Sequence, residues 1–523
     1  MKKENKTNIA RVKSLTIEGE ALLEVRGFIL KEKYPESLDF KPLDGEHNSK
    51  TFICHCEDIT VEKMLAAVGD RKVISSDELK HITRIGMGPC RGNRCIPRAR
   101  MLLKPYGIEV LGEPTPRGPM SNLVTLGDMV ADKKTENIII PKGGRWVEKV
   151  PAIIAGGGIA GSSLFRYLSE AGYKPYLINN GLGSSWRNIA GGRPAFSLPA
   201  LADIAKHNLE IFTKLNERHD IDLKLIRYVS FAHDEETFRS LEASKGWSDA
   251  YMVDRKDFRK EISQHFNPNL DLYSHALITN DCWQANPGLT LNTVREIGRE
   301  NGGTILENTK LLDVCKVGNE YRVIVQTPGR EFIEYRTEIF INALGADAGK
   351  FASKLGIETG LYPVKHQAFI TKRLPMLGKD GANLDMLIDR RKYKGFSAVY
   401  GQQLAETGQI IGCASPAIDA KETDKNLKVN TREFIEIATE IFTNWIPQLS
   451  GVGFQAVWSG YYIEPRYIVD PELGLFTGMR GHGFMLSQYI AKLYVDYLQG
   501  KPVPDYFHDL RLSGKGLSEQ AFK

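Results

Sequence analysis

The sequence lacks any apolar run long enough to cross a membrane. No uninterrupted apolar segment approaches the roughly 20 residues that a membrane-spanning helix requires. The N-terminal stretch Met1-Lys2-Lys3-Glu4-Asn5-Lys6 is charged and has no apolar core of the kind found in secretory signal peptides. We therefore expect a cytoplasmic protein, and this expectation is compatible with a peripheral link to a membrane or to quinone.

A strong excess of charge of either sign is also absent. The 523 residues carry a formal net charge of +5, which is too dilute over this length to favour nucleic-acid binding. Hydrophobic residues make up 42% and charged residues 25% of the chain, as is typical of a globular protein. We find no internal repeats and no low-complexity segments. The length and composition therefore indicate a globular protein of roughly two to four domains.

Cysteine is scarce and unevenly distributed. Four of the seven cysteines lie between positions 54 and 95. In a reducing compartment such a cluster favours a metal site over disulfides. Cys282, Cys315 and Cys413 stand alone, and we interpret them as small buried residues.

The most informative stretch that is present is a glycine-rich turn. The apolar run Ile153–Ala155 leads directly into Gly156-Gly157-Gly158-Ile159-Ala160-Gly161, and an apolar helix face follows. In a G-x-G-x-x-G motif the glycines allow a tight turn, a close approach of a pyrophosphate, and packing of the helix on the strand. Free N–H groups at the helix N-terminus attract the phosphates. The turn therefore predicts a dinucleotide site; the alternative is a glycine-rich turn that binds nothing.

Apolar periodicity predicts alternating strands and helices from residue 150 onward, interrupted by a segment rich in short strands. This pattern indicates an α/β fold with a β-rich insert. The predicted helices cover 60–68, 201–215, 254–262, 289–301, 431–445 and 487–499. The predicted strands cover 174–178, 228–232, 304–306, 321–326, 335–341, 368–371, 396–400 and 409–411.

The four clustered cysteines form two pairs, Cys54-His55-Cys56 and Cys90-Arg91-Gly92-Asn93-Arg94-Cys95. Four thiolates can hold a structural zinc ion or a [2Fe–2S] cluster. Zinc sites usually space their paired cysteines by two or more residues, so the Cys-x-Cys pair favours the cluster. With Gly86-Met87-Gly88-Pro89, the two pairs closely resemble the bacterioferritin-associated-ferredoxin-like [2Fe–2S] domain. The resemblance implies that the cluster is bound by Cys54, Cys56, Cys90 and Cys95.

From Val150 to about Asp509 the chain resembles the D-amino-acid-oxidase-like FAD oxidoreductases, which include sarcosine oxidase and glycine oxidase. The matching motifs are the loop 185–192, the second glycine turn 339–346, Trp458-Ser459-Gly460-Tyr461 and the closing turn 478–484. The resemblance implies a Rossmann-like FAD-binding domain of the glutathione-reductase type and a β-rich substrate domain. The implied cofactor-binding residues are Gly156, Gly158, Ile159, Ala160, Gly161, Asn179, Asn180, Arg187, Asn188, Ala190, Gly191, Gly192, Leu311, Ala343, Gly345, Gly481, His482, Gly483 and Phe484.

Three positions depart from the family pattern. Asn179, followed by Asn180, stands where the family usually has a glutamate that binds ribose hydroxyls, although an amide can also hydrogen-bond a hydroxyl. Tyr462 stands where an arginine often binds the substrate carboxylate. Ile410 stands where monomeric sarcosine oxidases carry a lysine that promotes reaction with oxygen. No histidine or cysteine stands where those relatives attach flavin covalently, so we expect dissociable FAD.

The resemblance implies hydride transfer to the flavin from a carbon that bears an amine. The stretch 364–371 resembles the corresponding strand of sarcosine and dimethylglycine enzymes, which favours a small amine or amino acid that is secondary or N-methylated. The alternatives are a 2-hydroxyacid or glycerol-3-phosphate dehydrogenase, or a non-catalytic redox-sensing protein with both cofactors. The candidate catalytic residues are His482, Lys365, His366, Arg466, Arg193 and Tyr462, with Arg466 and Arg193 as candidates for binding a carboxylate. Each of them could instead be an ordinary surface or core side chain.

A cluster attached to a flavin domain implies single-electron steps after a two-electron oxidation. We therefore expect a dehydrogenase that passes electrons to a carrier protein or a partner subunit, and an oligomeric assembly. The predicted domains are an unassigned N-terminal segment (1–50), a small, mainly helical [2Fe–2S] domain (51–105), a linker (106–147), an FAD-binding domain (148–232, 286–360 and 446–510), a substrate domain (233–285 and 361–445) and a C-terminal tail (511–523).

Overall fold

The computed structural model describes residues 51–54, 57, 59–87, 92, 95–112, 146–181, 183–196, 198–247, 249–262, 272–328, 331–372, 385–391, 395–404, 408–416, 431–445 and 447–517. The predicted N-terminal segment, Cys56, Cys90 and most of the predicted linker lie outside these residues. The chain divides into two compact units, one of Met1–Ile74 and Thr83–Val110 and one of Ser75–Ile82 and Leu111–Lys523. None of the helices in the described ranges combines the length and the apolarity that crossing a membrane requires.

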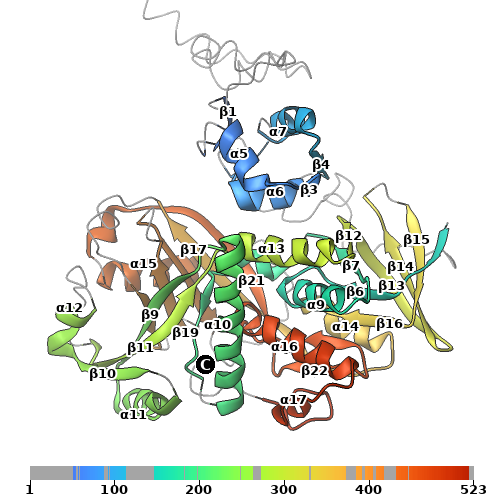
Figure 1. Cartoon of the computed structure of the whole chain (residues 1–523). Coiled ribbons are helices and arrows are strands. Elements are labelled where there is room, and N and C mark those ends of the chain that lie inside the picture. The colour runs from blue at the N-terminus through green and yellow to red at the C-terminus, as the bar shows by residue number, and fades with distance from the viewer. Residues whose placement is uncertain are drawn as a thin grey trace, which may run out of the picture. The chain divides into compact units, whose positions relative to one another are not determined.

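The first unit contains short strands and helices, several of which are labelled in Figure 1. Its elements include β1 (Phe52–Cys54), β2 (Ile59–Thr60), α5 (Val61–Val68), β3 (Val73–Ser75), α7 (Cys95–Leu103), the 3-10 helix η1 (Lys104–Tyr106) and β4 (Glu109–Leu111). Most of α6 (Ser76–Thr83) belongs to the second unit. The Thr60 hydroxyl caps α5 by accepting a hydrogen bond from the Lys63 amide at 3.3 Å. Residues 109–111 were expected in a linker but form a strand, because Ile108 and Val110 are buried.

A mainly parallel six-stranded sheet forms the first layer of the second unit. Its strands are β12 (Thr304–Glu307), β7 (Tyr176–Asn179), β6 (Ala152–Ala155), β16 (Ile339–Asn342), β23 (Leu475–Thr477) and β22 (Ile468–Asp470), in this order. Neighbouring strands are parallel except for β22 and β23. β7, which follows β6 in the chain, lies on one side of β6, and β16 lies on the other side. The carboxyl ends of β6 and β16 therefore form the switch point at which open α/β sheets bind ligands.

Helices cover one face of this sheet and a four-stranded sheet covers the other. Ile154 packs with Leu164 of the helical layer, whereas Ile153, its neighbour in β6, packs with Val323 of the four-stranded sheet. The helices are α9 (Ile159–Glu170), α10 (Pro199–His219), α13 (Pro287–Glu300) and α16 (Gly483–Leu498). The strands of the second sheet are β13 (Lys310–Val317), β14 (Glu320–Gln326), β15 (Phe332–Thr337) and β5 (Trp146–Lys149). This layering fixes the turn between β6 and α9 on a rigid support.

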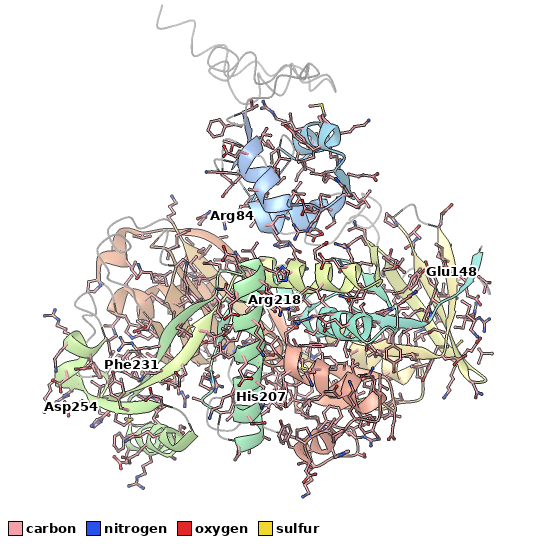
Figure 2. All side chains as sticks on the ribbon, viewed as in Figure 1. Arg84, Glu148, His207, Arg218, Phe231 and Asp254 are labelled. Atoms are coloured by element: carbon pink, nitrogen blue, oxygen red, sulfur yellow. The ribbon has the colours of Figure 1, made fainter. Side chains whose placement is uncertain are left out.

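A nine-stranded sheet forms the rest of the second unit, at the opposite end from the four-stranded sheet (Figure 1). Its order is β10 (Ala250–Asp254), β11 (His275–Gln284), β9 (Lys224–Ala232), β18 (Met386–Asp389), β19 (Phe396–Gln403), β20 (Ile410–Pro416), β17 (Tyr362–Thr371) and β21 (Phe454–Glu464), with β8 (Gly191–Gly192) paired to β11. α15 (Arg432–Trp445) packs on one face through Phe434, Ile441 and Trp445. Phe231 on β9 is fully buried in this core, whereas Asp254 ends the edge strand β10 (Figure 2).

Short elements connect these layers. The helices are α11 (Glu235–Ala243), α12 (Phe258–Glu261), α14 (Ala348–Ser353) and α17 (Tyr506–Asp509). The 3-10 helices are η2 (Ser184–Arg187), η3 (Ser244–Trp247), η4 (Arg255–Asp257), η6 (Gly345–Asp347) and η8 (Pro447–Gly451).

The architecture confirms the predicted α/β fold with a β-rich second domain, but several boundaries differ. The single strand expected over 335–341 is wrong, because β15 ends at Thr337 and β16 begins at Ile339 in a different sheet. The helix expected over 254–262 consists only of η4 and α12. Residues 224–232 and 454–464 were expected in the FAD-binding domain and instead form β9 and β21 of the nine-stranded sheet. Alternating apolar residues indicate a strand but not the sheet that it joins.

Candidate active site

The glycine turn lies at the switch point between β6 and β16. Gly156 has a φ of +113°, and a Cβ atom on it would lie 2.3 Å from the Ala343 carbonyl oxygen. A Cβ atom on Gly161 would lie 1.9 Å from the Gly156 carbonyl oxygen. Both positions therefore require glycine, and the turn brings the N-terminus of α9 to the end of β6. The geometry is that of a dinucleotide turn.

The loop 183–191 is held between the start of α9 and strand β21. The Ser185 hydroxyl accepts a hydrogen bond from the Ile159 amide at 2.8 Å. The Ser184 hydroxyl accepts one from the Tyr461 amide at 2.8 Å, and the Trp458 indole donates to the Arg187 carbonyl at 2.7 Å. These contacts fix the loop against both domains of the second unit.

The closing turn carries His482 at the N-cap of α16. Its Nδ1 atom lies 2.6 Å from the Tyr467 hydroxyl, and its backbone amide donates to the Met479 carbonyl at 2.7 Å. Burial, together with the positive charges of Arg193 and Arg480, lowers the pKa of His482 well below its ordinary value. The histidine is therefore neutral, and the positive end of the α16 dipole borders the cavity at this turn.

One cavity of about 570 Å³ connects these three motifs, which is within the usual range for a ligand site. The predicted cofactor-binding residues that line it are Gly156, Gly158, Ile159, Ala160, Asn179, Asn180, Arg187, Asn188, Ala190, Gly191, Ala343, Gly345, Gly481, His482, Gly483 and Phe484. Gly161, Gly192 and Leu311 do not line it. Gly161 packs on the turn, Gly192 leaves room for the Trp283 ring, and Leu311 belongs to a buried apolar cluster.

The nine-stranded sheet supplies the far wall of the cavity. His366 on β17 stacks on Tyr462 of β21 with ring centres 3.5 Å apart, and the hydroxyls of Tyr462 and Tyr400 lie 2.9 Å apart. Burial lowers the pKa of His366 to about 3, so its imidazole is neutral. Burial also raises the pKa of both tyrosines, which keeps their hydroxyls protonated. The wall therefore presents neutral hydrogen-bonding groups on aromatic surface.

The positive charges of the cavity come from arginines. The lining arginines are Arg187, Arg193, Arg390 and Arg480, and Asp347 is the only carboxylate among the described lining residues. Arg480 pairs with Glu464 at 2.8 Å. The Arg193 guanidinium lies 4.2 Å from the centre of the Phe196 ring and donates to the Ala195 carbonyl.

Arg390 was missed by the sequence analysis. Met386, Ile388 and Arg390 alternate along and just beyond β18, and all three line the cavity. Period-two spacing places them on one face of the sheet. The signal was therefore present, but no strand was predicted over 386–389.

Two predicted catalytic residues lie away from the cavity. The Arg466 guanidinium donates to the carbonyls of Arg511 at 2.6 Å and Leu512 at 3.0 Å, and Arg466 is not among the residues that line the cavity. The expectation that it binds a substrate carboxylate is not supported, because these contacts use it to hold the C-terminal turn. Lys365 is buried on β17 next to His366 but does not line the cavity either. The alternation of side chains along a strand explains this difference.

Two of the four predicted cluster ligands are described, and both are buried in the first unit. Cys54 ends β1, and Cys95 begins α7. The Gly86 amide donates to the Cys95 sulfur at 3.1 Å. An amide that donates to a cysteine sulfur suits a thiolate that binds an iron–sulfur cluster. Of the isolated cysteines, Cys282 and Cys413 are buried as expected, whereas Cys315 is partly exposed.

The residues of the large cavity fit FAD. The glycine turn that borders it excludes every side chain at Gly156, as close approach of a pyrophosphate requires. The N-terminus of α9 borders the cavity at that turn, and the N-terminus of α16 borders it beside the polar wall.

Comparisons with known proteins also indicate an FAD-binding protein. The family model of FAD dependent oxidoreductases matches residues 152–497, and that of the BFD-like [2Fe-2S] binding domain matches residues 52–104. These models indicate FAD and a [2Fe–2S] cluster as cofactors.

Curated relatives match only segments of the chain. One of the subunits of opine oxidase from Rhizobium meliloti is 36% identical over 86 residues, which are 16% of this chain and 15% of that protein. 4-Methylaminobutanoate oxidase (formaldehyde-forming) of Paenarthrobacter nicotinovorans is 24% identical over 226 residues, which are 42% of this chain and 27% of that protein. The chain thus spans well under two thirds of the length of either relative.

Among solved structures, L-proline dehydrogenase from P. horikoshii superposes with a TM-score of 0.60 at 23% identity, covering 70% of this chain and 97% of that one. This likeness shows the shared fold. Together with the match over residues 152–497, more than half of the sequence, it establishes that the chain belongs to the family of FAD dependent oxidoreductases.

Proposed function

We propose that this protein is an FAD-dependent dehydrogenase that oxidises a small secondary or N-methylated amino acid at the carbon next to nitrogen. In this proposal the electrons leave through the [2Fe–2S] cluster to an external acceptor. The observation that carries the proposal is the wall of the cavity, where the neutral group of His366, Tyr400 and Tyr462 lies on the sheet whose strand β18 leads into Arg390.

The neutral wall suits an uncharged amine. Loss of hydride from the neighbouring carbon requires a free lone pair on nitrogen, so the ammonium form is unreactive. Arginines outnumber carboxylates among the described lining residues, and this balance disfavours an ammonium ion. His366 is one of the residues that line the cavity. We propose that this imidazole, held by its stack on Tyr462, hydrogen-bonds the substrate nitrogen.

A carboxylate on the substrate needs a cationic partner, since a buried unpaired charge is costly. Arg390 borders the cavity just beyond β18, a strand of the sheet that carries Tyr400 and His366. The Arg193 guanidinium already donates to a backbone carbonyl and lies over Phe196. We propose Arg390 as the group that binds the carboxylate, because it lines the cavity together with Met386 and Ile388, and Arg193 as a charge that supports it.

FAD, when bound, accepts the hydride. The protein supplies the arrangement around it. His366 and Arg390 would orient the two ends of the substrate, and the apolar side chains Met386, Ile388 and Ala398 would exclude water. The N-terminus of α16 would favour the negative charge that develops at its end of the cavity.

The electron route rests on the [2Fe–2S] domain. The position of Ile410 gives this route no support, because Ile410 is buried in the core beneath α15 and does not line the cavity. A cluster accepts single electrons, and its presence in the same chain favours a dehydrogenase whose acceptor is a carrier protein or a partner subunit. The names of the relatives fit the proposed substrate class and not the electron route, because one is named for a methylamino compound and both are named as oxidases.

The test is anaerobic bleaching of the flavin by a panel of compounds. The panel contains sarcosine, proline and an N-methyl amine without a carboxylate, with lactate and glycerol 3-phosphate as the alternatives. Secondary or N-methylated amino acids should bleach the flavin fastest. Bleaching by lactate or glycerol 3-phosphate with no response to any amine would contradict the proposed substrate class.

Arg390→Ala and Arg466→Ala form a matched pair for the carboxylate site. Arg390→Ala should weaken turnover of carboxylated amines by about 2–4 kcal/mol, and it should barely affect an amine without a carboxylate. Arg466→Ala should lower stability without changing this discrimination, because its partners are the carbonyls of the C-terminal turn. Equal effects of both variants on all amines would refute the role of Arg390.

A further inference from the structure

The strand ends beside the glycine turn carry an unusual pair of polar residues. Asn179 ends β7, at the position where the resemblance described above leads one to expect a glutamate for the ribose hydroxyls of FAD. Glu307 ends β12, the next strand of the parallel sheet, and is the register partner of Asn179. A carboxylate is therefore present at this edge of the sheet, one strand further out.

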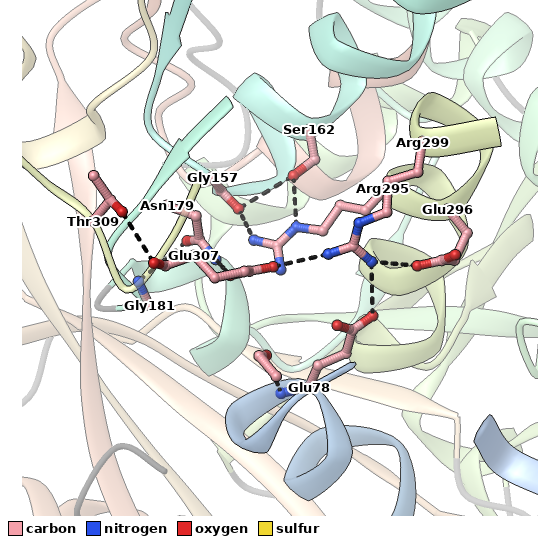
Figure 3. A network of polar contacts seen from close by, with 11 residues as sticks. Glu78, Gly157, Ser162, Asn179, Gly181, Arg295, Glu296, Arg299, Glu307 and Thr309 are labelled. Atoms are coloured by element: carbon pink, nitrogen blue, oxygen red, sulfur yellow. Dashed lines mark hydrogen bonds and ion pairs between the residues drawn. The ribbon is translucent and has the colours of Figure 1, made fainter. Parts of the chain in front are cut away.

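The two side chains are held together in a defined orientation (Figure 3). The Asn179 side-chain amide donates to one Glu307 oxygen at 2.6 Å, and its carbonyl oxygen accepts from the Gly181 amide at 3.1 Å. The other Glu307 oxygen accepts from Arg299 at 3.0 Å. The short contact with a carboxylate is a charge-assisted hydrogen bond, which is stronger than a contact between neutral groups.

The pair adjoins the dinucleotide turn. Asn179 lines the cavity, and a Cβ atom on Gly157 would lie 2.5 Å from its side-chain oxygen. The Gly157 carbonyl in turn accepts a hydrogen bond from the buried Arg295, which also donates to the Ser162 hydroxyl at 3.1 Å (Figure 3). The position of Asn179 is thus fixed by packing against the turn as well as by Glu307.

Asn179 keeps hydrogen-bonding capacity for a ligand in the cavity. An amide group has two N–H donors and two acceptor lone pairs, and the contacts above use one of each on Asn179. A ribose with two adjacent hydroxyls needs acceptors for two O–H groups.

We infer that Glu307 is the residue on which recognition of the adenosine ribose of FAD depends, and that it acts through Asn179, because Asn179 lines the cavity and Glu307 does not. The carboxylate that the family places at the end of the second strand is supplied by the neighbouring strand. This inference rests on FAD binding, which the family establishes, and is independent of the proposed substrate.

A purely structural role for Glu307 is the competing explanation, because Arg299 is its ion-pair partner. Glu296 provides a matched control, since it also pairs with Arg299 but makes no contact with Asn179 that the structure describes. Arg299 has a third carboxylate at 3.8 Å in Glu78, so either substitution leaves it with two partners.

The test measures dissociation constants of FAD, and of an FAD analogue without the two adenosine-ribose hydroxyls, for the flavin-depleted full-length protein. The proteins compared are the wild type, Glu307→Gln and Glu296→Gln. Glu307→Gln should weaken FAD binding by about 10- to 100-fold and leave the analogue nearly unaffected. Glu296→Gln should leave both constants within about twofold of the wild type.

A double substitution distinguishes a specific loss of FAD binding from misfolding of the Glu307→Gln variant. Asn179→Asp with Glu307→Gln moves the carboxylate to β7 and keeps a hydrogen bond between the strands with its direction reversed. This variant should bind FAD at least about fivefold more tightly than Glu307→Gln alone. Equal losses for FAD and the analogue in Glu307→Gln, or a double variant no better than the single one, would overturn the inference. Failure of every amine to reduce the bound flavin would leave it intact.

Discussion

Replacing Gly156 by alanine should damage both the fold and FAD binding, and Gly172 offers a matched comparison. Both glycines have positive φ angles, +113° for Gly156 and +87° for Gly172. A Cβ atom on Gly172 would meet nothing within 4 Å, whereas one on Gly156 would lie 2.3 Å from the Ala343 carbonyl oxygen and 2.7 Å from its carbon. The two variants therefore share backbone strain and differ in steric overlap.

The expected loss of folding free energy follows from the backbone strain and the steric overlap. A side chain in the left-handed region costs about 1–2 kcal/mol, and this applies to both variants. Overpacking typically adds about 1–3 kcal/mol, and here the overlapping atoms are backbone atoms at the end of β16, which no rotamer change can move. Gly156→Ala should therefore lose about 2–5 kcal/mol of folding free energy, and Gly172→Ala about 1–2 kcal/mol.

Urea unfolding of the flavin-depleted variants measures this difference as a shift in midpoint at constant slope. The ratio of flavin to protein absorbance, measured on each variant as purified, reports FAD content. Gly156→Ala should be the less stable variant and should lose FAD, whereas Gly172→Ala should keep it. Equal destabilisation of the two variants, or a Gly156→Ala protein with its full content of FAD, would refute the close approach of the two turns.

Three further predictions concern the cluster, the pH dependence and the electron acceptor. Cys95→Ser should remove iron and the cluster's visible absorbance while FAD stays bound, because the described lining of the cavity belongs to the second unit; a stoichiometric zinc content in the wild type would contradict the cluster. The folded pKa of His366 is about 3, below its ordinary value, so the unfolded state binds more protons below about pH 6.5 and stability should fall as the pH drops from there toward 3. His366→Phe should recover about 2–3 kcal/mol of this loss at roughly pH 4.5, as measured by urea unfolding, and an unchanged acid sensitivity would argue against a buried neutral imidazole. With a working substrate, a dye or quinone analogue should be reduced much faster than oxygen, and peroxide formation at the dye's rate would indicate an oxidase instead.

Local signals predicted much of the fold. The helix expected over 289–301 corresponds to α13, and the one expected over 431–445 corresponds to α15, because each has an apolar face of helical period. The glycine turn was predictable because its residues are consecutive and each glycine has a steric reason. The assignment of β9 and β21 to the nine-stranded sheet was not, because strand pairing between distant segments leaves no local mark.

The substrate side of the site was less predictable than the cofactor side. Arg466 was a plausible carboxylate ligand by its spacing from Tyr462, but it binds carbonyls of the C-terminal turn. Arg390 was overlooked because β18 is only four residues long and gives a weak periodic signal. The pairing of Asn179 with Glu307 depends on the register of two parallel strands, which only the folded sheet reveals.

The most direct test of the central claim is an anaerobic titration of the wild-type holoprotein with a secondary or N-methylated amino acid, followed by flavin absorbance and electron paramagnetic resonance. We predict that the flavin bleaches and that the signal of the singly reduced [2Fe–2S] cluster appears before any external acceptor is added. Bleaching that leaves the cluster oxidised would contradict the electron route. A flavin that no amine bleaches, but that lactate or glycerol 3-phosphate does, would contradict the substrate class.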